Sequence, residues 1–347
     1  MKNIVCWGGL LLISTQAMAV DMECSKIAGD SERLACYDQS NKLPVIVADL
    51  PQVTAADKAA AETAQKAEYE KIQLERLGSG MVDRWELDPA KSTGVFLPKV
   101  YKPTYILPIT YTSNVNRAQS LPSANFDPAN APQLSAAEAK FQISLKAKVW
   151  EHPMGLDANL WAGYTQSSRW QIYSPDLSRP FRETNYEPEV MMVFHTPYEI
   201  FGWQGRIASL SLNHQSNGRA LPLSRSWNRI IGEIGLERED WSLSLRPWWR
   251  IKEKIGNDDN PDIENYAGRG EVLLTHTMKR HVFTLQARHS LRSGADSRGS
   301  MQIDWAFPLG AGVHGYLQLF SGYGESLIDY NFKQTKLGLG ISLVEWR

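Results

Sequence analysis

A histidine, a serine and an asparagine lie close enough along the chain to act together in nucleophilic catalysis. His214 and Ser216 stand two positions apart, and Asn228 follows a turn marked by Gly218 and Pro222. A serine hydroxyl is a weak nucleophile until a neighbouring base takes its proton, and histidine can do so near neutral pH. The imidazole needs a third group that fixes its tautomer and orientation, and an asparagine amide oxygen can fill that role. These residue types therefore predict a reaction through a covalent serine intermediate.

A β-hairpin would bring the three residues together. Side chains alternate across a strand, so Leu210, Leu212, His214 and Ser216 share one face. If the hairpin is centred near residue 221, His214 lies opposite Asn228, with their Cβ atoms about 4.5–5.5 Å apart. Asn228 also shares a face with the isoleucines that follow it on the returning strand. All three polar residues are then expected on the apolar face, at its outer end.

Two other interpretations of this hairpin remain open at this point. A His-x-Ser pair is common by chance, and a histidine at the end of a strand is usually a solvated rim residue. The same hairpin could also belong to a soluble protein, or could turn its polar residues toward the lumen of a barrel. The shared apolar parity of Ser216, His214 and Asn228 favours catalysis.

The N-terminus predicts export from the cytoplasm. Lys2 precedes a short apolar run at residues 4–13, and Ala17-Met18-Ala19 has the small-residue spacing of a cleavage site. Residues 1–19 are therefore expected to be a signal peptide, with the mature chain starting near Val20. No later segment has eighteen consecutive apolar residues, so no transmembrane helix is expected. An exported chain of this kind is either soluble or a β-barrel.

The rest of the chain favours a barrel over a soluble sandwich. From about residue 105, short segments of alternating polarity follow one another between clusters of turn-forming residues. A sandwich also alternates, but the signal peptide, the 12 Trp and 13 Tyr and an even number of strands favour a closed bacterial barrel. The net charge of −1 gives no indication of nucleic-acid binding. Twelve strands are predicted, near 105–113, 139–151, 158–167, 188–197, 204–216, 226–236, 240–251, 266–277, 280–290, 299–305, 312–322 and 335–345.

The segment before the barrel has a different composition. Residues 20–100 are expected to form an N-terminal periplasmic extension, and residues 101–347 the barrel domain. Cys6 leaves with the signal peptide, and the remaining pair, Cys24 and Cys36, is expected to form a disulfide in an oxidising compartment. Residues 55–77 are rich in good helix formers but have few apolar positions, which predicts a solvated helix or a flexible linker.

Several motifs resemble the outer-membrane phospholipase A family. They run in the family's order over about residues 100–347, so the resemblance covers the whole predicted barrel. The matching stretches are YTQ at 164–166, PFRETNYEP at 180–188, NHQSNGR at 213–219, SRSWNR at 224–229, DDNPDI at 258–263 and SGYGESLIDYNF at 321–332.

This resemblance implies an all-β, twelve-stranded antiparallel transmembrane β-barrel in the bacterial outer membrane. It implies calcium-dependent hydrolysis of phospholipid acyl esters at either glycerol position, with activation by formation of a homodimer. By position, Ser216 matches the nucleophile, His214 the base and Asn228 the third member of the triad. The backbone amide of Gly218 would help to hold the oxyanion.

The resemblance also implies where Ca2+ would bind and where two subunits would meet. Calcium ligands map onto the carbonyl of Arg219, onto Ser224 and onto Ser178 of the partner subunit, and Gln166 matches a polar residue at the dimer seam. Carbonyl and hydroxyl oxygens are suitable calcium ligands, and a glutamine among lipid-facing residues is costly unless it is paired.

Three positions depart from the family pattern. A second calcium site in the family uses an acidic residue where this chain has Leu221, although Asp259 remains in the matching acidic loop. The loop before Asp258 is slightly longer than the pattern, and the chain ends in Trp346-Arg347 rather than on an aromatic residue. Two rival functions also remain: an acyl hydrolase acting on lipid A or another envelope lipid, and a passive channel or structural barrel.

Overall fold

The computed structural model describes residues 24–40, 58, 60, 61, 63, 64, 80–116, 134–254, 256, 258–310 and 313–344. The predicted signal peptide at 1–19 and the terminal Trp346-Arg347 lie outside the described residues. The described residues of the predicted helix or linker at 55–77 are helical. In the described part of the chain, no helix combines the length and apolar character needed to cross a membrane.

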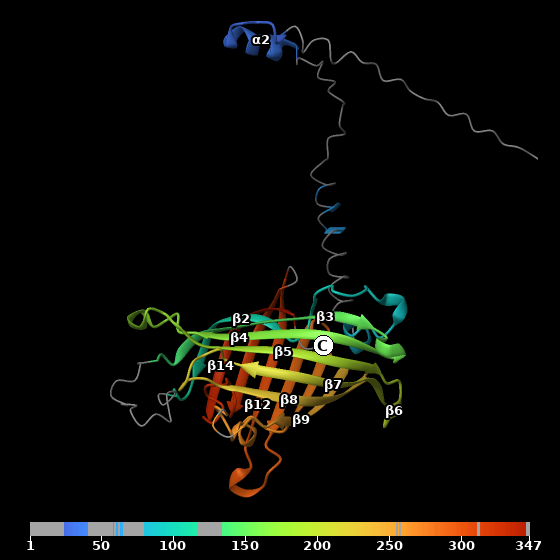
Figure 1. Ribbon diagram of the computed structural model, residues 1–347, viewed down its shortest axis with the longest axis vertical. Coiled ribbons are helices and arrows are strands. Elements are labelled where there is room, and N and C mark those ends of the chain that lie inside the picture. The colour runs from blue at the N-terminus through green and yellow to red at the C-terminus, as the bar shows by residue number, and fades with distance from the viewer. Residues whose placement is uncertain are drawn as a thin grey trace, which may run out of the picture. The chain divides into compact units, whose positions relative to one another are not determined.

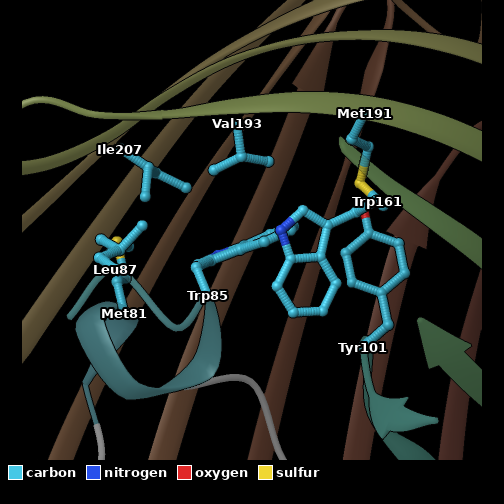
Figure 2. Close-up of a cluster of buried hydrophobic side chains, with 8 residues drawn as sticks. All are labelled: Met81, Trp85, Leu87, Tyr101, Trp161, Met191, Val193 and Ile207. Carbon is cyan, nitrogen blue, oxygen red and sulfur yellow. The ribbon is translucent and has the colours of Figure 1, made fainter. Parts of the chain in front are cut away.

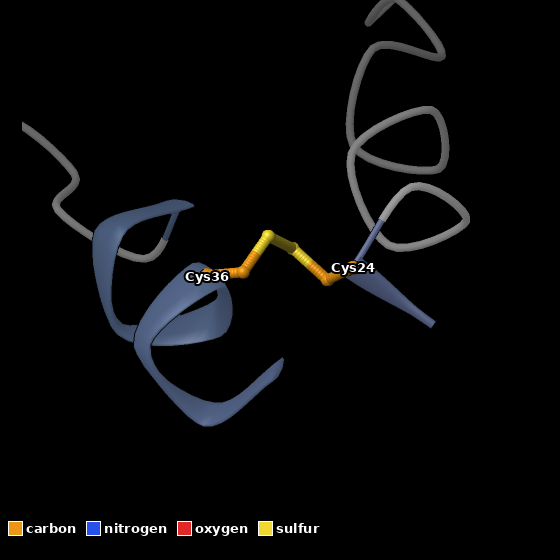
Figure 3. The surroundings of a disulfide bond; sticks show 2 residues. All are labelled: Cys24 and Cys36. Carbon is orange, nitrogen blue, oxygen red and sulfur yellow. A yellow bond between two sulfur atoms is a disulfide. The ribbon is translucent and has the colours of Figure 1, made fainter. Parts of the chain in front are cut away.

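The chain divides into two compact units, Met1–Gln65 and Lys66–Arg347. In the first unit, helix α2 (Asp30–Ser40) is tied to the preceding turn by a disulfide between Cys24 and Cys36, whose Cα atoms lie 5.7 Å apart (Figure 3). The guanidinium of Arg33 donates a hydrogen bond of 3.2 Å to the carbonyl of Ile27 inside the closed loop. The predicted disulfide is therefore confirmed.

The second unit is a closed antiparallel β-barrel built from twelve long strands (Figure 1). Each strand pairs with the next along the chain, and pairing of the last strand with the first closes the sheet without a free edge. The strands are β2 (Thr104–Thr112), β3 (Ala137–Glu151), β4 (Ala158–Trp170), β5 (Phe181–His195), β7 (Trp203–Ser216), β8 (Ser226–Arg238), β9 (Trp241–Ile251), β10 (Gly270–Met278), β11 (His281–His289), β12 (Gly299–Gly310), β13 (Val313–Gly322) and β14 (Gln334–Val344).

Short elements complete the second unit. Strand β1 (Lys99–Val100) pairs with β3, and β6 (Glu199–Ile200) pairs with β7. The helices are α4 (Met81–Arg84) and the single-turn 3₁₀ segments η1 (Pro89–Lys91), η3 (Pro153–Gly155), η4 (Pro175–Leu177), η5 (Ile263–Asn265) and η6 (Gly294–Asp296).

All twelve predicted strands are present, and two of their boundaries differ from the prediction by five residues or more. Strand β5 starts at Phe181 rather than at residue 188. Its first residues include Arg182 and Glu183, which are both buried inside the barrel. This part of the strand therefore lacks the alternation of polar and apolar residues that predicts a strand. Strand β12 runs to Gly310 rather than ending at residue 305. Pro308, in the added part of the strand, lies beside a register shift, where a strand tolerates proline.

The two faces of the strands have opposite character. On β7, Leu210 and Leu212 are 56% and 60% exposed on the outside, whereas Ser211 and Asn213 are each 3% exposed on the inside. Strand β9 repeats this, with Trp249 outside and Arg246 buried inside. A soluble sandwich buries its apolar face, so an apolar exterior around a polar interior identifies a membrane-spanning barrel.

The interior is crossed by ion pairs. Glu325 contacts Lys140 at 3.0 Å, Arg169 at 3.1 Å and Lys336 at 3.0 Å, all of them buried. Arg182 forms a further pair with Glu138 at 2.7 Å. Lys140, Arg169 and Glu325 of this network line an internal cavity of about 130 Å³. Buried charges of opposite sign offset part of one another's desolvation cost. The ion pairs connect side chains of β3, β4, β5 and β14 across the interior of the barrel.

Residues 80–101, which we call the plug, place four buried apolar side chains inside one end of the barrel. Met81, Trp85, Leu87 and Tyr101 of the plug join Trp161 and three further barrel side chains in an apolar cluster (Figure 2). One of those, Ile207, lies near the start of β7, whereas Ser216 ends that strand. The plug therefore occupies the end of the barrel opposite Ser216.

Charged groups fasten the plug to the wall. The ammonium of Lys146 lies 3.0 Å from the ring centre of Trp85, a cation–π contact that favours a buried cation. Burial alone would raise the pKa of Glu86, but hydrogen bonds from Lys148, Lys99 and Thr93 lower that pKa to about 2. No motif in the sequence predicts this plug.

Candidate active site

The β7–β8 hairpin aligns the predicted catalytic residues. Strand β7 ends at Ser216 and β8 begins at Ser226, and the register pairs His214 with Asn228 as predicted. His214 is exposed, and Ser216 and Asn228 are half-buried, on the outer face of the barrel. The neighbouring residues of opposite parity, Asn213 and Asn217, are buried inside. The alternative with a lumen-facing hairpin is therefore wrong.

The imidazole of His214 is held by the amide of Asn228. His214 Nδ1 lies 2.7 Å from Asn228 Oδ1. An amide oxygen accepts but cannot donate, so this hydrogen bond places the proton of a neutral imidazole on Nδ1. The lone pair is then on Nε2, which is the arrangement that a general base requires.

Ser216 lies on the same face, one strand repeat beyond His214. Residues two apart along a strand are about 6.6–6.8 Å apart at Cα, a distance that an imidazole side chain spans. Ser216 is also opposite Tyr186 of β5, which in turn is opposite Gln166 of β4. Gln166, Tyr186 and Ser216 therefore occupy one row across three adjacent strands.

Gly218 adopts a backbone conformation that only glycine takes easily. Its φ is +64°, in the left-handed region, and a Cβ there would lie 3.2 Å from Cε2 of Tyr186. The glycine lets the chain turn sharply directly after Ser216. Its backbone amide comes two residues after the serine in the chain.

The β7–β8 loop brings a serine hydroxyl to a carboxylate of the β9–β10 loop. The hydroxyl of Ser224 donates a hydrogen bond to Asp259 Oδ2, so these two predicted calcium ligands lie together. The guanidinium of Arg219 donates to the carbonyl of Arg182 at 3.2 Å, which ties the β7–β8 loop to the start of β5. A hydroxyl next to a carboxylate is a hard-oxygen donor set of the kind that Ca2+ prefers. The described residues include no cluster of three His, Cys, Asp or Glu side chains able to hold a metal.

Hydrogen bonds connect the β9–β10 loop, which follows Ile251, to the start of β8. Asn260 Oδ1 accepts from the backbone amide of Ser226 at 2.9 Å, next to the contact between Asp259 and Ser224. The loop's own base is fixed by Arg250, which donates to Asp258 and to the carbonyl of Pro261. These bonds hold the strand on which Asn228 sits.

Sequence reasoning missed one residue of this site. Glu253 Oε1 accepts a hydrogen bond of 3.2 Å from Asn228 Nδ2. The sequence did carry a signal, because Trp249, Ile251 and Glu253 continue the outward parity of β9. Ile251 is the register partner of Asn228, which places Glu253 one strand repeat further along the same face.

Two predicted residues lie outside this cluster within the single chain. Ser178 follows η4 with a left-handed φ of 58° and belongs to the β4–β5 loop. Gln166 faces outward on β4 and accepts a hydrogen bond of 3.3 Å from Tyr164. Its register partners, Ile143 and Tyr186, are 49% and 36% exposed on an apolar surface. Both positions are compatible with contacts to a second subunit.

Comparison with known proteins gives a consistent result. The model of the family described as Phospholipase A1 matches residues 81–343. Phospholipase A1 of Escherichia coli strain K12 is 38% identical over 244 residues, which cover 70% of this chain and 80% of that protein.

Solved structures resemble the barrel closely. The crystal structure of the Salmonella typhi outer membrane phospholipase dimer with bound calcium aligns with a TM-score of 0.64 at 35% identity, covering 72% of this chain and 93% of that one. Outer membrane phospholipase A from Escherichia coli aligns with a TM-score of 0.65 at 35% identity, covering 75% and 95%. The range matched by the family model includes the hairpin and all but the first residue of the plug and the last residue of β14.

Proposed function

The chain belongs to the phospholipase A1 family of outer-membrane hydrolases, and on that premise we propose that Ser216, His214 and Asn228 form its catalytic triad. The observation that carries the proposal is the 2.7 Å hydrogen bond from His214 to Asn228 on the outer face of the barrel. A polar pair on the outer face cannot line a pore through the barrel. On that face it can meet the esters of lipids that surround the barrel.

The substrate would approach along the apolar wall. A row of outward side chains on β5, β7, β8 and β9 lies one strand repeat from the His214–Asn228 pair. This row consists of Val190, Leu212, Ile230 and Trp249. Acyl chains packed on this row would bring the ester carbonyl to Ser216 at the membrane rim. We propose cleavage at both the sn-1 and the sn-2 position.

The reaction would proceed in two halves. Ser216 Oγ attacks the ester carbonyl while His214 Nε2 accepts its proton, and the amide of Gly218 donates to the oxyanion. Collapse expels the lysophospholipid oxygen, which takes the proton from His214, and leaves an acyl group on Ser216. A water molecule then attacks this ester, again giving its proton to His214, and the fatty acid leaves. Asn228 keeps the imidazole oriented throughout.

We propose that the enzyme requires Ca2+. The carbonyl of Arg219, the side chains of Ser224 and Asp259, and Ser178 of the partner subunit would hold it. The proximity of Ser224 to Asp259 supports this set, as does the bound calcium in the Salmonella relative. A bound calcium would supply positive charge that offsets the charge of the oxyanion.

We propose that the active form is a homodimer. Neighbouring strands are about 4.8 Å apart, so the row from Gln166 to Ser216 spans roughly 10 Å. A second subunit seated on Gln166 would therefore lie beside the nucleophile and could cover the acyl chains. The Salmonella relative was crystallised as a dimer, which supports this arrangement.

Fatty-acid release from mixed phospholipid micelles tests the proposal. We expect release that requires calcium, stops with a chelator and is abolished by Ser216→Ala, with both fatty acids released from a substrate that carries different sn-1 and sn-2 chains. Release that survives Ser216→Ala would move the nucleophile elsewhere. Cleavage of lipid A but not of phospholipid would favour the other envelope hydrolase, and conductance without ester cleavage would favour a passive barrel.

A further inference from the structure

Asn228 forms hydrogen bonds at both ends of its side-chain amide. Oδ1 accepts from His214 Nδ1 at 2.7 Å, and Nδ2 donates to Glu253 Oε1 at 3.2 Å. Glu253 is half-buried and lies just beyond β9, at the start of the β9–β10 loop. The three side chains form a continuous series, from carboxylate to amide to imidazole.

The orientation of the Asn228 amide decides whether His214 can act as a base. An amide has nearly the same shape in its two flipped orientations. If Asn228 turned its NH₂ group toward His214, it would donate to Nδ1 and leave the imidazole proton on Nε2. His214 could not then accept a proton from Ser216. A neutral third residue therefore needs something else to select its orientation, whereas a carboxylate would not.

Glu253 supplies that selection. An ionised carboxylate is only an acceptor, so it binds the NH₂ end of Asn228 and would repel the oxygen end. Hydrogen bonds in such a series also polarise one another. The negative carboxylate would make Asn228 Oδ1 a better acceptor for the imidazolium that forms during catalysis. We infer that Glu253 is a positioning residue that holds Asn228 in its productive orientation, an inference that rests on the proposed triad.

The loop carrying Glu253 is anchored independently of Asn228. Arg250 donates to the Pro261 carbonyl at 2.7 Å, and Asn260 accepts from the Ser226 amide at 2.9 Å. Loss of the Glu253 carboxylate would therefore leave the loop in place. Glu264 offers a matched control on the same loop, because it is half-buried and ion-paired with Arg269 but makes no contact with the triad.

The test compares Glu253→Ala, Glu253→Gln and Glu264→Ala in the full-length protein, each with and without Asn228→Ala. Initial rates are measured on mixed micelles at saturating calcium. We expect Glu253→Ala to lower kcat by about tenfold with little change in KM, and Glu264→Ala to stay within about twofold of wild type. Glu253→Gln should fall between wild type and Glu253→Ala, because its amide can accept the same bond in one of two orientations.

The double variants distinguish positioning from a general effect on folding. In the Asn228→Ala background we expect Glu253→Ala to have no further effect, because the residue through which it acts is gone. The same loss of kcat in both backgrounds, or no loss in either, would overturn the inference. If Ser216→Ala remained active, the triad itself would fail. If Ser216→Ala abolished activity but Glu253→Ala kept the wild-type kcat, only the role of Glu253 would be rejected.

Discussion

Replacing Asn228 by aspartate should impair the enzyme, even though it would create the more familiar triad of serine, histidine and a carboxylate. Asn228 Nδ2 and Glu253 Oε1 are 3.2 Å apart. In Asn228→Asp, two carboxylates would face each other at this separation. Their repulsion would be about 1 kcal/mol at the dielectric of bulk water and about 5 kcal/mol at an effective dielectric near 20. Glu253 is partly exposed, so a value between these limits is expected.

This repulsion is relieved either by protonation of one carboxyl group or by rotation of the aspartate away from His214. Both outcomes weaken the support of the imidazole, so we expect Asn228→Asp to lower kcat at neutral pH by about tenfold. Adding Glu253→Gln removes the like charge and supplies a donor to the new aspartate. The double variant should recover most of the lost activity.

The assay is the initial rate of fatty-acid release from mixed micelles at saturating calcium, with folding checked by the electrophoretic mobility of the unheated barrel. The diagnostic quantity is the ratio of the double variant to Asn228→Asp. A ratio near one, or an Asn228→Asp enzyme as fast as wild type, would refute the view that the Glu253 carboxylate acts on this position.

Three further predictions concern other parts of the molecule. Gly218→Ala should lower kcat by about tenfold in a folded barrel, because a side chain would be strained at φ +64° and would crowd Tyr186; wild-type rates would contradict this. Ser224→Ala should raise the calcium concentration for half-maximal activity by about tenfold, with full rates restored at high calcium; a calcium titration measures this, and an unchanged midpoint would count against the ligand set. The pKa of Glu86 is lowered from its ordinary value of 4.5 to about 2, so its contribution of roughly 3 kcal/mol is present above pH 4.5 and is lost as pH falls toward 2. Thermal unfolding of Glu86→Gln in detergent should lack this part of the pH dependence, whereas an unchanged dependence would reject the assignment.

Much of the barrel could be predicted because its strands must alternate. Each strand separates lipid from a polar interior, so the pattern recurs wherever a strand crosses the apolar layer. Prediction was wrong at the start of β5, because the consecutive residues Arg182 and Glu183 are both buried beside polar partners and interrupt the alternation. The plug was not predictable either. Trp85 and Tyr101 are buried only because distant strands supply Trp161 and Lys146.

The pairing of His214 with Asn228 was predictable for a related reason, since a short hairpin fixes its own register. Glu253 was not predicted, because its partner lies on the preceding strand and its loop is long. The parity of Trp249 and Ile251 pointed to the correct face, but not to the distance from Asn228. Local sequence thus determines which face a side chain occupies, and loop geometry determines which partner it reaches.

The position of the proposed triad on the outer face follows from closure of the barrel. Moving β7 by one residue relative to its neighbours would turn Ser216 and His214 inward and expose Asn213 to lipid. That shift is prevented on both sides, because β7 is paired along its length with β5 and with β8. Inside, Asn213 is bonded to Glu187 at 2.9 Å and to Glu189 at 3.2 Å. Breaking these buried bonds would leave polar groups without partners. The internal polar network therefore holds the register that keeps Ser216 facing the lipid, and the geometry of the proposed triad depends on contacts made on the opposite side of the sheet.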